Sequence, residues 1–229
     1  AASYIWHKIL GNPRNFEMRH AYFGPAFSND EIEKTLVDYK VKFNYVKNPA
    51  KRGAELIAQS KILGWLQGRM EVGPRALGNR SILADPRLPE MKDILNQRVK
   101  HREGFRPFAP SVIEEEAKDY FENYYPSPFM LLVSPVKQEK RREVPAICHV
   151  DGTGRPQTVH PETNPLYWEL ISEFKKLTDV PMVLNTSFNV RGEPIVCTPE
   201  DALKCFLSTQ MDALIMGNYL VEKSIVGSG

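Results

Sequence analysis

The sequence predicts an α/β or α+β fold, in which helices flank one twisted, mixed β-sheet. Three observations support this prediction. Amphipathic segments with helical spacing alternate with single, short apolar stretches, which is the pattern of a sheet covered by helices. The length of 229 residues suits one large domain, or one domain with an added subdomain. A hydrophobic fraction of 42% is ordinary for a soluble globular protein, so we expect one buried core.

Six segments carry the periodicity or the capping residues of helices. Ser28, followed three residues later by Glu31, has the pattern of a capping box. Thr198 is a suitable N-cap because Pro199 and Asp201 follow it in the first turn. We expect helices from residue 28 onward, in the first part of 51–68, over 88–100, in the second part of 105–122, over 164–179 and over 198–209.

Short apolar stretches between these helices predict the strands. The stretch "FMLLVSPVK" (129–137) has the continuous apolar run of a buried strand. The stretch "VPMVL" (180–184) is expected to be a strand that runs into a polar loop. Further strands are expected within 41–47, at the end of 51–68, on both sides of the glycine turn in 149–159, and over 211–223 as a pair or as a strand and turn.

The charge balance and the cysteines exclude several classes of protein. With 30 Lys and Arg residues against 28 Asp and Glu residues, the net charge is only +2, so any basic site must be local. The three cysteines have no CxxC spacing, which argues against a disulfide framework or a zinc site and predicts a reducing, cytoplasmic location. No apolar run approaches the roughly 18 residues that a membrane span needs, so no membrane partner is expected.

The chain shows no convincing linker after residue 50. We therefore interpret residues 1–50 as a segment from an inter-domain region or from a missing N-terminal part, and residues 51–229 as a domain.

Four polar segments interrupt this scaffold, and together they predict an anion site. They are "GRMEVGPRALGNRS" (68–81), "VKHREGFRPFAPS" (99–111), "HVDGTGRPQTV" (149–159) and "LNTSFNVRGEP" (184–194). Arginine grips phosphate or carboxylate with two hydrogen bonds at once, and glycine lets backbone N–H groups approach an anion. Ser187 and Asn189 are two residues apart, so both side chains face the same way on an extended segment.

Each segment also has a purely structural interpretation. Arg69, Arg75 and Arg80 could be solvated surface charges, and Arg155 could make a structural salt bridge. The basic run from Lys100 to Arg106 could complement the C-terminus of the helix before it, while Ser187 and Asn189 could simply end a strand. The sequence contains no Walker loop and no GxGxxG, HExxH or GxSxG motif, so conventional nucleotide cradles, zincins and hydrolases are excluded.

The same four segments, in the longer forms "GRMEVGPRALGNRSILADPR" and "LNTSFNVRGEPIVCTPEDAL", resemble the C-terminal domain of the O-carbamoyltransferases. That family includes nodulation-factor, cephamycin and aminoglycoside-antibiotic carbamoyltransferases, and the resemblance covers most of the chain. It implies a YrdC-like fold for residues 51–229, similar to threonylcarbamoyl-adenylate synthases. It further implies that whole enzymes carry an N-terminal Kae1-like domain, which would be the partner of this one.

The resemblance also implies an activity. The YrdC-like domain would form carbamoyl adenylate from carbamoyl phosphate and ATP, with Mg²⁺ accompanying the ATP, and the Kae1-like domain would pass the carbamoyl group to an acceptor hydroxyl. The residues in the matching positions for the reaction are Lys100, Arg106, Arg155, Ser187 and Asn189.

Further residues are placed at the edge of the site or in its supporting shell: Arg75, Asn79, Arg80 and Arg102. The sequence identifies no metal ligand, although Glu71 and Asp151 are candidates.

Two other interpretations of a YrdC-like domain stay open: an RNA-binding module and a non-catalytic docking module. The sequence gives the first little support, because only Phe105 and Phe108 place aromatic rings among the basic residues.

Overall fold

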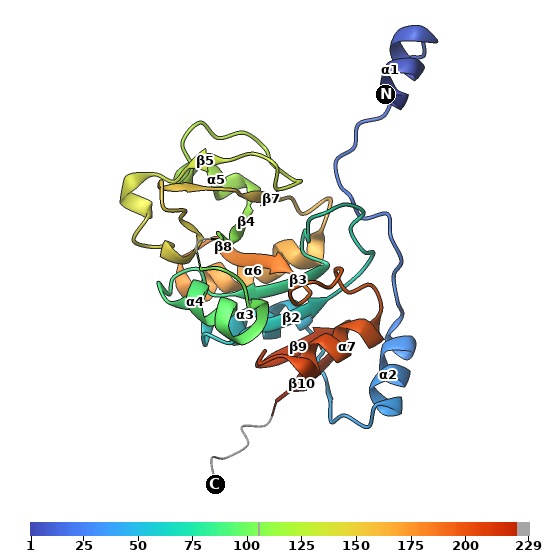
Figure 1. Ribbon diagram of the computed structural model, residues 1–229, viewed down its shortest axis with the longest axis vertical. Coiled ribbons are helices and arrows are strands. Elements are labelled where there is room, and N and C mark those ends of the chain that lie inside the picture. The colour runs from blue at the N-terminus through green and yellow to red at the C-terminus, as the bar shows by residue number, and fades with distance from the viewer. Residues whose placement is uncertain (105, 224–229) are drawn as a thin grey trace.

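A mixed sheet lies at the centre of the computed structural model, which describes residues 1–104 and 106–223 (Figure 1). Within these residues the sheet has eight strands in the order β1-β10-β9-β2-β3-β8-β4-β7, and a separate pair is formed by β5 and β6. The pairs β2–β9 and β4–β7 are parallel and the other pairs of the large sheet are antiparallel. The predicted mixed sheet is thus confirmed. The strands are β1 (Asn44–Tyr45), β2 (Leu63–Leu66), β3 (Arg80–Ala84), β4 (Ala109–Ile113), β5 (Ser134–Pro135), β6 (Thr153–Gly154), β7 (Gln157–Val159), β8 (Met182–Ser187), β9 (Ala213–Met216) and β10 (Tyr219–Glu222).

Helices form where the capping residues and the apolar spacing predict them. Ser28 with Glu31 and Thr198 with Asp201 make the two reciprocal capping boxes at the starts of their helices. The predicted helix over 88–100 consists of an α-helix followed directly by a π-helical turn, η2 (Asn96–Lys100). The α-helices are α1 (Ala2–Tyr4), α2 (Asn29–Asp38), α3 (Pro49–Ala58), α4 (Met91–Leu95), α5 (Glu114–Tyr120), α6 (Pro165–Thr178) and α7 (Pro199–Ser208).

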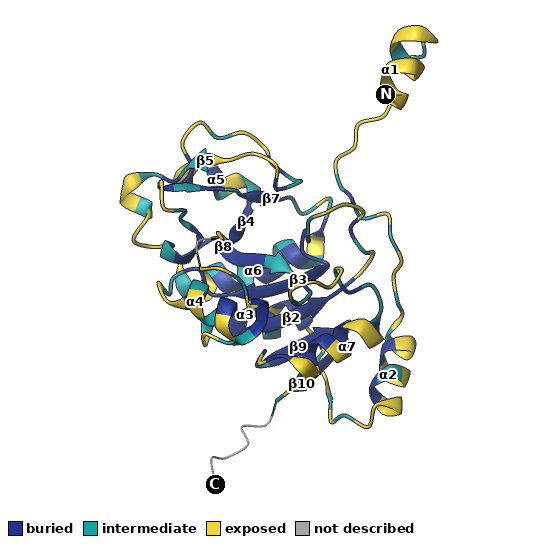
Figure 2. Cartoon of the chain, viewed as in Figure 1, coloured by how far each residue is buried: buried dark blue, intermediate teal, exposed yellow. Residues whose placement is uncertain are grey.

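The core lies between the sheet and the helices packed on it, where Figure 2 shows the strands β2, β3, β4 and β9 buried. Helices α3 and α6 pack against each other at Gly53, where a Cβ would meet the side chains of Leu170 and Leu63. Gly64 follows Leu63 in β2, and a Cβ there would meet Phe188, which is fully buried. Because side chains alternate across a strand, β2 packs against different layers on its two faces.

The strand registers bring the four polar segments to one edge of the sheet. Ser187, at the end of β8, pairs with Ser81 at the start of β3. Asn185 pairs with Ala109, the first residue of β4, and β4 in turn pairs with the start of β7. The segments 68–79, 101–108 and 155–156 lead into β3, β4 and β7, while 188–192 leaves β8. They therefore meet around the end of β8.

One predicted strand is wrong over most of its length. In the stretch 129–137 only Ser134–Pro135 forms a strand, and Val136 adds a single bridge to Phe121. The preceding side chains of Leu131, Leu132 and Val133 are 67%, 45% and 57% exposed. An apolar run alone does not show that a segment enters a sheet. Here proline limits the ladder, because Pro135 has no N–H to donate.

Residues 1–50 do not behave as one unit. The start of the chain, with α1, stands apart from the sheet (Figure 1), whereas β1 pairs with β10 at the sheet edge and α2 packs against α7. The division at residue 50 stays a prediction. The last residues of the predicted domain, 224–229, lie outside the described part of the chain, as does Phe105. In that described part, no helix has both the length and the apolarity to cross a membrane.

Substituting Gly78 by alanine should destabilise the fold strongly. Gly78 has φ +105°, and an added Cβ would overlap the buried ring of Tyr167. We expect the free energy of unfolding to fall by at least about 2 kcal/mol in a denaturant titration.

Gly104→Ala is the matched control, because a Cβ there meets nothing within 4 Å. Its free energy of unfolding should change by less than about 0.5 kcal/mol. Equal unfolding midpoints for the two variants would contradict this account of the 68–81 segment.

Candidate functional site

Two adjoining cavities lie where the four polar segments meet. The first, which we call the arginine cavity, has a volume of about 90 Å³ and is lined by Arg75, Arg102 and Arg155 together with Asn185, Thr186 and Ser187. The second, which we call the lysine cavity, has a volume of about 200 Å³. Arg102 and Ser187 line both cavities, so the two form one continuous site. The lysine cavity is lined by Lys100, Arg102, Arg106, Ser187, Asn189, Val190, Arg191 and Gly192.

Buried donors without partners characterise the arginine cavity. Among the described residues, the Nε atoms of Arg75 and Arg155 are buried and have no hydrogen-bond partner. Arg102 lies with its guanidinium carbon 4.4 Å from the centre of the Phe108 ring, and its Nε donates to Asn96 Oδ1 at 3.1 Å. Since an unpaired buried N–H costs free energy, an acceptor that reached these donors would stabilise them.

Lys100 holds the turn that follows β8. Its Nζ donates to Asn189 O and Asn189 Oδ1, both at 2.9 Å, to Ser187 Oγ at 3.3 Å and to Ser187 O. The Ser187 hydroxyl donates in turn to Asn189 Oδ1 at 2.7 Å. An ammonium group has three N–H donors, so these four oxygens use all of them. Lys100 therefore contributes charge and order to the site rather than a free donor.

The outer part of the lysine cavity carries two more arginines and one carboxylate. Glu103 pairs with Arg106 at 3.0 Å and with Arg191 at 3.8 Å. All three side chains are substantially exposed, so the two ion pairs add little to stability. A phosphate arriving in the cavity would compete with this carboxylate for the same two guanidinium groups.

The pKa shifts record first the burial of the cations and then their closeness to one another. Burial, and then the charge of Arg102, lowers the pKa of Lys100 to about 7. Burial is also the main cause that lowers the pKa of Arg102, with the charge of Arg106 next, and that of Arg155, with the charge of Arg75 next. A bound anion would relieve this repulsion.

Asn79 and Arg80, which the sequence places at the edge of the site, line neither cavity. The Asn79 amide donates to Arg69 O at 2.7 Å and accepts from Asn164 at 2.9 Å. Arg80 is fully buried, and its guanidinium donates to backbone carbonyls, including Gln67 O at 2.7 Å and Cys197 O at 3.1 Å. The side chains of both residues hold the backbone of their segment in place, and neither offers a free group to a ligand.

The two candidate metal ligands are also used within the protein. Glu71 is buried, and its Oε1 accepts from the backbone N–H groups of Leu77 at 2.6 Å and Asn79 at 2.7 Å. Asp151 accepts from the N–H and the hydroxyl of Thr153 at 3.0 and 2.7 Å. In the described residues, no three His, Cys, Asp or Glu side chains gather as a metal site would require. Glu71 and Asp151 line neither of the two adjoining cavities.

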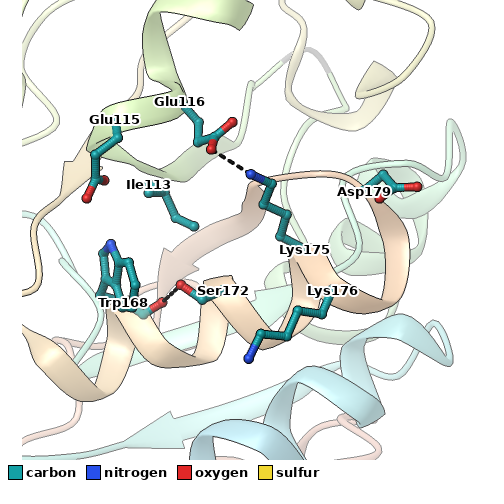
Figure 3. A pocket seen from close by; sticks show the side chains of 8 residues that line it. All are labelled: Ile113, Glu115, Glu116, Trp168, Ser172, Lys175, Lys176 and Asp179. Atoms are coloured by element: carbon teal, nitrogen blue, oxygen red, sulfur yellow. Dashed lines mark hydrogen bonds and ion pairs between the residues drawn. The ribbon is translucent and has the colours of Figure 1, made fainter.

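A further cavity, of about 500 Å³, lies between α5 and α6 and differs in chemistry (Figure 3). It is lined by Ile113 and Trp168, and Lys175 at its wall pairs with Glu116 at 2.5 Å. Lys176 is likewise paired, with Glu173 at 2.5 Å. None of the residues predicted for the anion site lines it, so it does not compete with the two adjoining cavities as the candidate site.

The sequence analysis does not single out two lining residues that carry an amide or a guanidinium group, Asn185 and Arg191. Asn185 continues the two-residue alternation of Ser187 and Asn189 one step back into the strand, so the spacing already indicates that its side chain shares their face. Arg191 lies in the same polar segment but has no such spacing signal, and only the structure places it in the lysine cavity.

Comparisons with known proteins agree with the motifs. A family model described as the carbamoyltransferase C-terminus matches residues 54–223. The chain is 46% identical to protein sll1178 of Synechocystis sp., over 98% of this chain and 41% of that protein. It is 48% identical to the nodulation protein NolNO of Sinorhizobium fredii, over 90% of this chain and 31% of that protein. The chain thus spans less than half the length of these relatives.

Solved structures show the same fold. Pyrococcus abyssi Sua5 complexed with L-threonine gives a TM-score of 0.53 at 15% identity, covering 74% of this chain and 46% of that one. Full-length HypF in the phosphate- and nucleotide-bound form gives 0.53 at 22% identity, covering 76% of this chain and 22% of that one. At these identities the likeness shows the fold alone, which is the YrdC-like fold. On the family match and the long relatives together, the chain belongs to the carbamoyltransferase C-terminal family.

Proposed function

We propose that this domain forms carbamoyl adenylate from carbamoyl phosphate and ATP, and that a Kae1-like part of a longer protein transfers the carbamoyl group to an acceptor hydroxyl. The observation that carries the proposal is the excess of positive charge around two adjoining cavities. Six basic side chains line them, and in the described residues the ion pairs of these six all go to Glu103. Two phosphorylated substrates would supply the missing negative charge.

The two cavities would hold different parts of the reactants. The arginine cavity is small, and its buried Nε donors would take the carbamoyl phosphate end. The lysine cavity would take the phosphates of ATP, because Arg102, Arg106 and Arg191 surround it. Since Arg102 lines both cavities, it would contact both anions where they meet. HypF in its phosphate- and nucleotide-bound form supports this choice of ligands as a fold-level analogy.

A groove of about 590 Å³ is lined by the residues that follow the lysine cavity in the chain, and it would suit the nucleoside part of ATP. Gly192 lines the cavity, and the next residues, Glu193–Cys197, line the groove together with α7. A mostly apolar groove of this size is typical of a small-molecule site.

The chemistry would need positioning and fixed charge rather than a nucleophilic side chain. Carbamoyl phosphate would lose its phosphoryl group to water as phosphate, which leaves carbamate. A carbamate oxygen would then bond to the α-phosphorus of ATP as the bond to pyrophosphate breaks. Both partners are anions, so the surrounding guanidinium groups would offset their repulsion and stabilise the charge that develops. Mg²⁺ would be carried mainly by the phosphates of ATP, as is usual for this ion.

Carbamoyl-phosphate-dependent exchange between ATP and pyrophosphate, measured with Mg²⁺, is the direct test of the proposed activity. The paired variant Ser187→Ala with Asn189→Ala should lower this exchange by at least about a hundredfold, by analogy with loss of an oxyanion donor. Arg142→Ala is the control, because Arg142 is exposed and lines neither cavity.

Exchange that continues without carbamoyl phosphate would contradict the proposal. No exchange at all from the folded chain, together with exchange from a full-length relative, would show that the domain needs the rest of a longer protein.

The charge of Lys100 should make anion binding depend on pH. Its pKa is lowered to about 7, so the ammonium loses its proton as the pH rises through this value, and the site loses one positive charge. We expect the affinity for sulfate, which does not titrate in this range, to fall roughly tenfold between about pH 6 and about pH 8.5 in calorimetric titrations.

Lys100→Met removes the titrating group, so its weaker sulfate binding should show a much smaller change over the same pH range. A wild-type affinity that stays constant across it would show that Lys100 keeps its proton.

A further inference from the structure

We propose that residues 21–25, which we call the strap, hold the turn that carries Arg75 in its anion-binding position, and that the strap opens without unfolding of the sheet. Opening of the strap weakens anion binding. The inference rests on the proposed anion site, because it concerns how one arginine of that site is kept in place. It also gives a role to Arg69, which lines neither of the two adjoining cavities.

The turn that carries Arg75 consists of residues 73–76, and it has little hydrogen bonding of its own. Within residues 1–104 and 106–223, these four residues make no backbone–backbone hydrogen bond. A side chain reaches the turn at Ala76 O, which accepts from Asn185 Nδ2 at 3.3 Å. The position of such a turn is set mainly by the residues on either side of it.

The strap holds the residues before the turn. It runs antiparallel to residues 70–72 and is joined to them by three backbone hydrogen bonds: Val72 N to Ala21 O at 2.8 Å, and Gly24 N to Met70 O and Met70 N to Pro25 O, both at 2.9 Å. Arg69 adds two side-chain bonds, from Nε to Gly24 O at 3.0 Å and from Nη2 to Phe23 O at 2.9 Å. The buried Arg80 donates to Pro25 O at 3.2 Å.

The strap also holds the residue that follows the turn. The Tyr22 hydroxyl donates to Leu77 O at 2.8 Å, and burial raises the pKa of this hydroxyl, so it stays protonated and keeps donating. Ala21 is buried and belongs to one apolar cluster with Leu77, Ala109 and Met130. Ala109 and Met130 line the arginine cavity. The strap therefore supports the wall of this cavity as well as both ends of the turn.

The chain on either side of the strap leaves it free to open separately. Residues 13–19 before it are exposed, as are Pro25 and Ala26 at its end. Arg19 makes only ion pairs of 3.6 and 3.8 Å, to exposed carboxylates. A short segment that is held by hydrogen bonds near the surface and joined to exposed chain on both sides is typical of a unit that opens locally.

Hydrogen exchange of the wild-type chain tests the coupling without any substitution. If the open strap does not bind the anion, sulfate at about 100 times its Kd should slow exchange of the Gly24, Met70 and Val72 amides about a hundredfold. The Tyr39 amide at the end of α2 is the control, and its exchange should not change. Without sulfate, mild denaturant should speed exchange of the Ile215 amide in β9 but not of the strap amides.

Gly24→Ala opens the strap without a change of charge. The added Cβ would lie 2.9 Å from Met70 O, a backbone atom that cannot turn aside. We expect the affinity of the folded chain for sulfate to fall at least about tenfold in calorimetric titrations, because the turn loses its support. Gly11→Ala is the control, since a Cβ there meets nothing within 4 Å, and its affinity should stay within about twofold of wild type.

Arg69→Met removes two of the bonds that hold the strap, so the Gly24 amide should exchange at least about tenfold faster. Arg14→Met removes the same charge from an exposed position and should leave this exchange unchanged.

The outcomes separate the strap from the site. Sulfate that binds wild-type protein without slowing the strap amides would overturn the inference and leave the anion site standing. A folded Gly24→Ala chain with wild-type affinity would do the same, as would strap amides that exchange only when β9 unfolds. Failure of sulfate to bind wild-type protein would instead overturn the anion site, and the proposed function with it.

Discussion

The Arg80 guanidinium is the interaction on which the site depends most. It is fully buried and donates to five backbone carbonyl oxygens, those of Pro25, Gln67, Gly68, Asn79 and Cys197. These carbonyls belong to parts of the chain that are far apart in the sequence. Burying one charge among so many acceptors is favourable only while all of them are satisfied, and each such bond to a charged group contributes about 1.5–3 kcal/mol. The backbone around the start of β3 is therefore held as one unit.

Glu71, which carries the opposite charge, holds the same part of the backbone. Its carboxylate accepts the N–H groups of Leu77, Asn79 and Arg80, which orders the turn between β2 and β3. Arg75 lies within that turn and extends into the arginine cavity. Two of the charged residues in the segment thus serve to fix the backbone, so that a third can be held with a buried, unpaired donor. Without these contacts a glycine-rich turn would have many backbone conformations, and holding Arg75 in one place would cost more conformational entropy.

The sequence predicts the sheet, the capped helices and the four segments of the site, because periodicity and turn residues are local signals. It does not show that Arg75 lines the cavity while Arg80 is fully buried. Both are arginines of one short segment, and they differ only in the side of the backbone on which their side chains lie. That difference follows from the pairing of Ser81 with Ser187, which connects residues far apart in the chain. Leu131, Leu132 and Val133 show the opposite failure, since their apolar run predicts a buried strand although these three side chains are exposed.

The arginine cavity holds strong positive charge beside a neutral amide. Charge alone would bind any phosphate, because guanidinium groups recognise oxygens without regard to what the phosphate carries. Selectivity needs an acceptor, and an exposed carboxylate such as Glu103 would be drawn to the nearest arginine, as it is in the lysine cavity. A neutral amide avoids this loss. Asn185, held by Ser111 and Gln157, lines the same cavity as three guanidinium groups and does not cancel their charge, so the cavity keeps its positive charge.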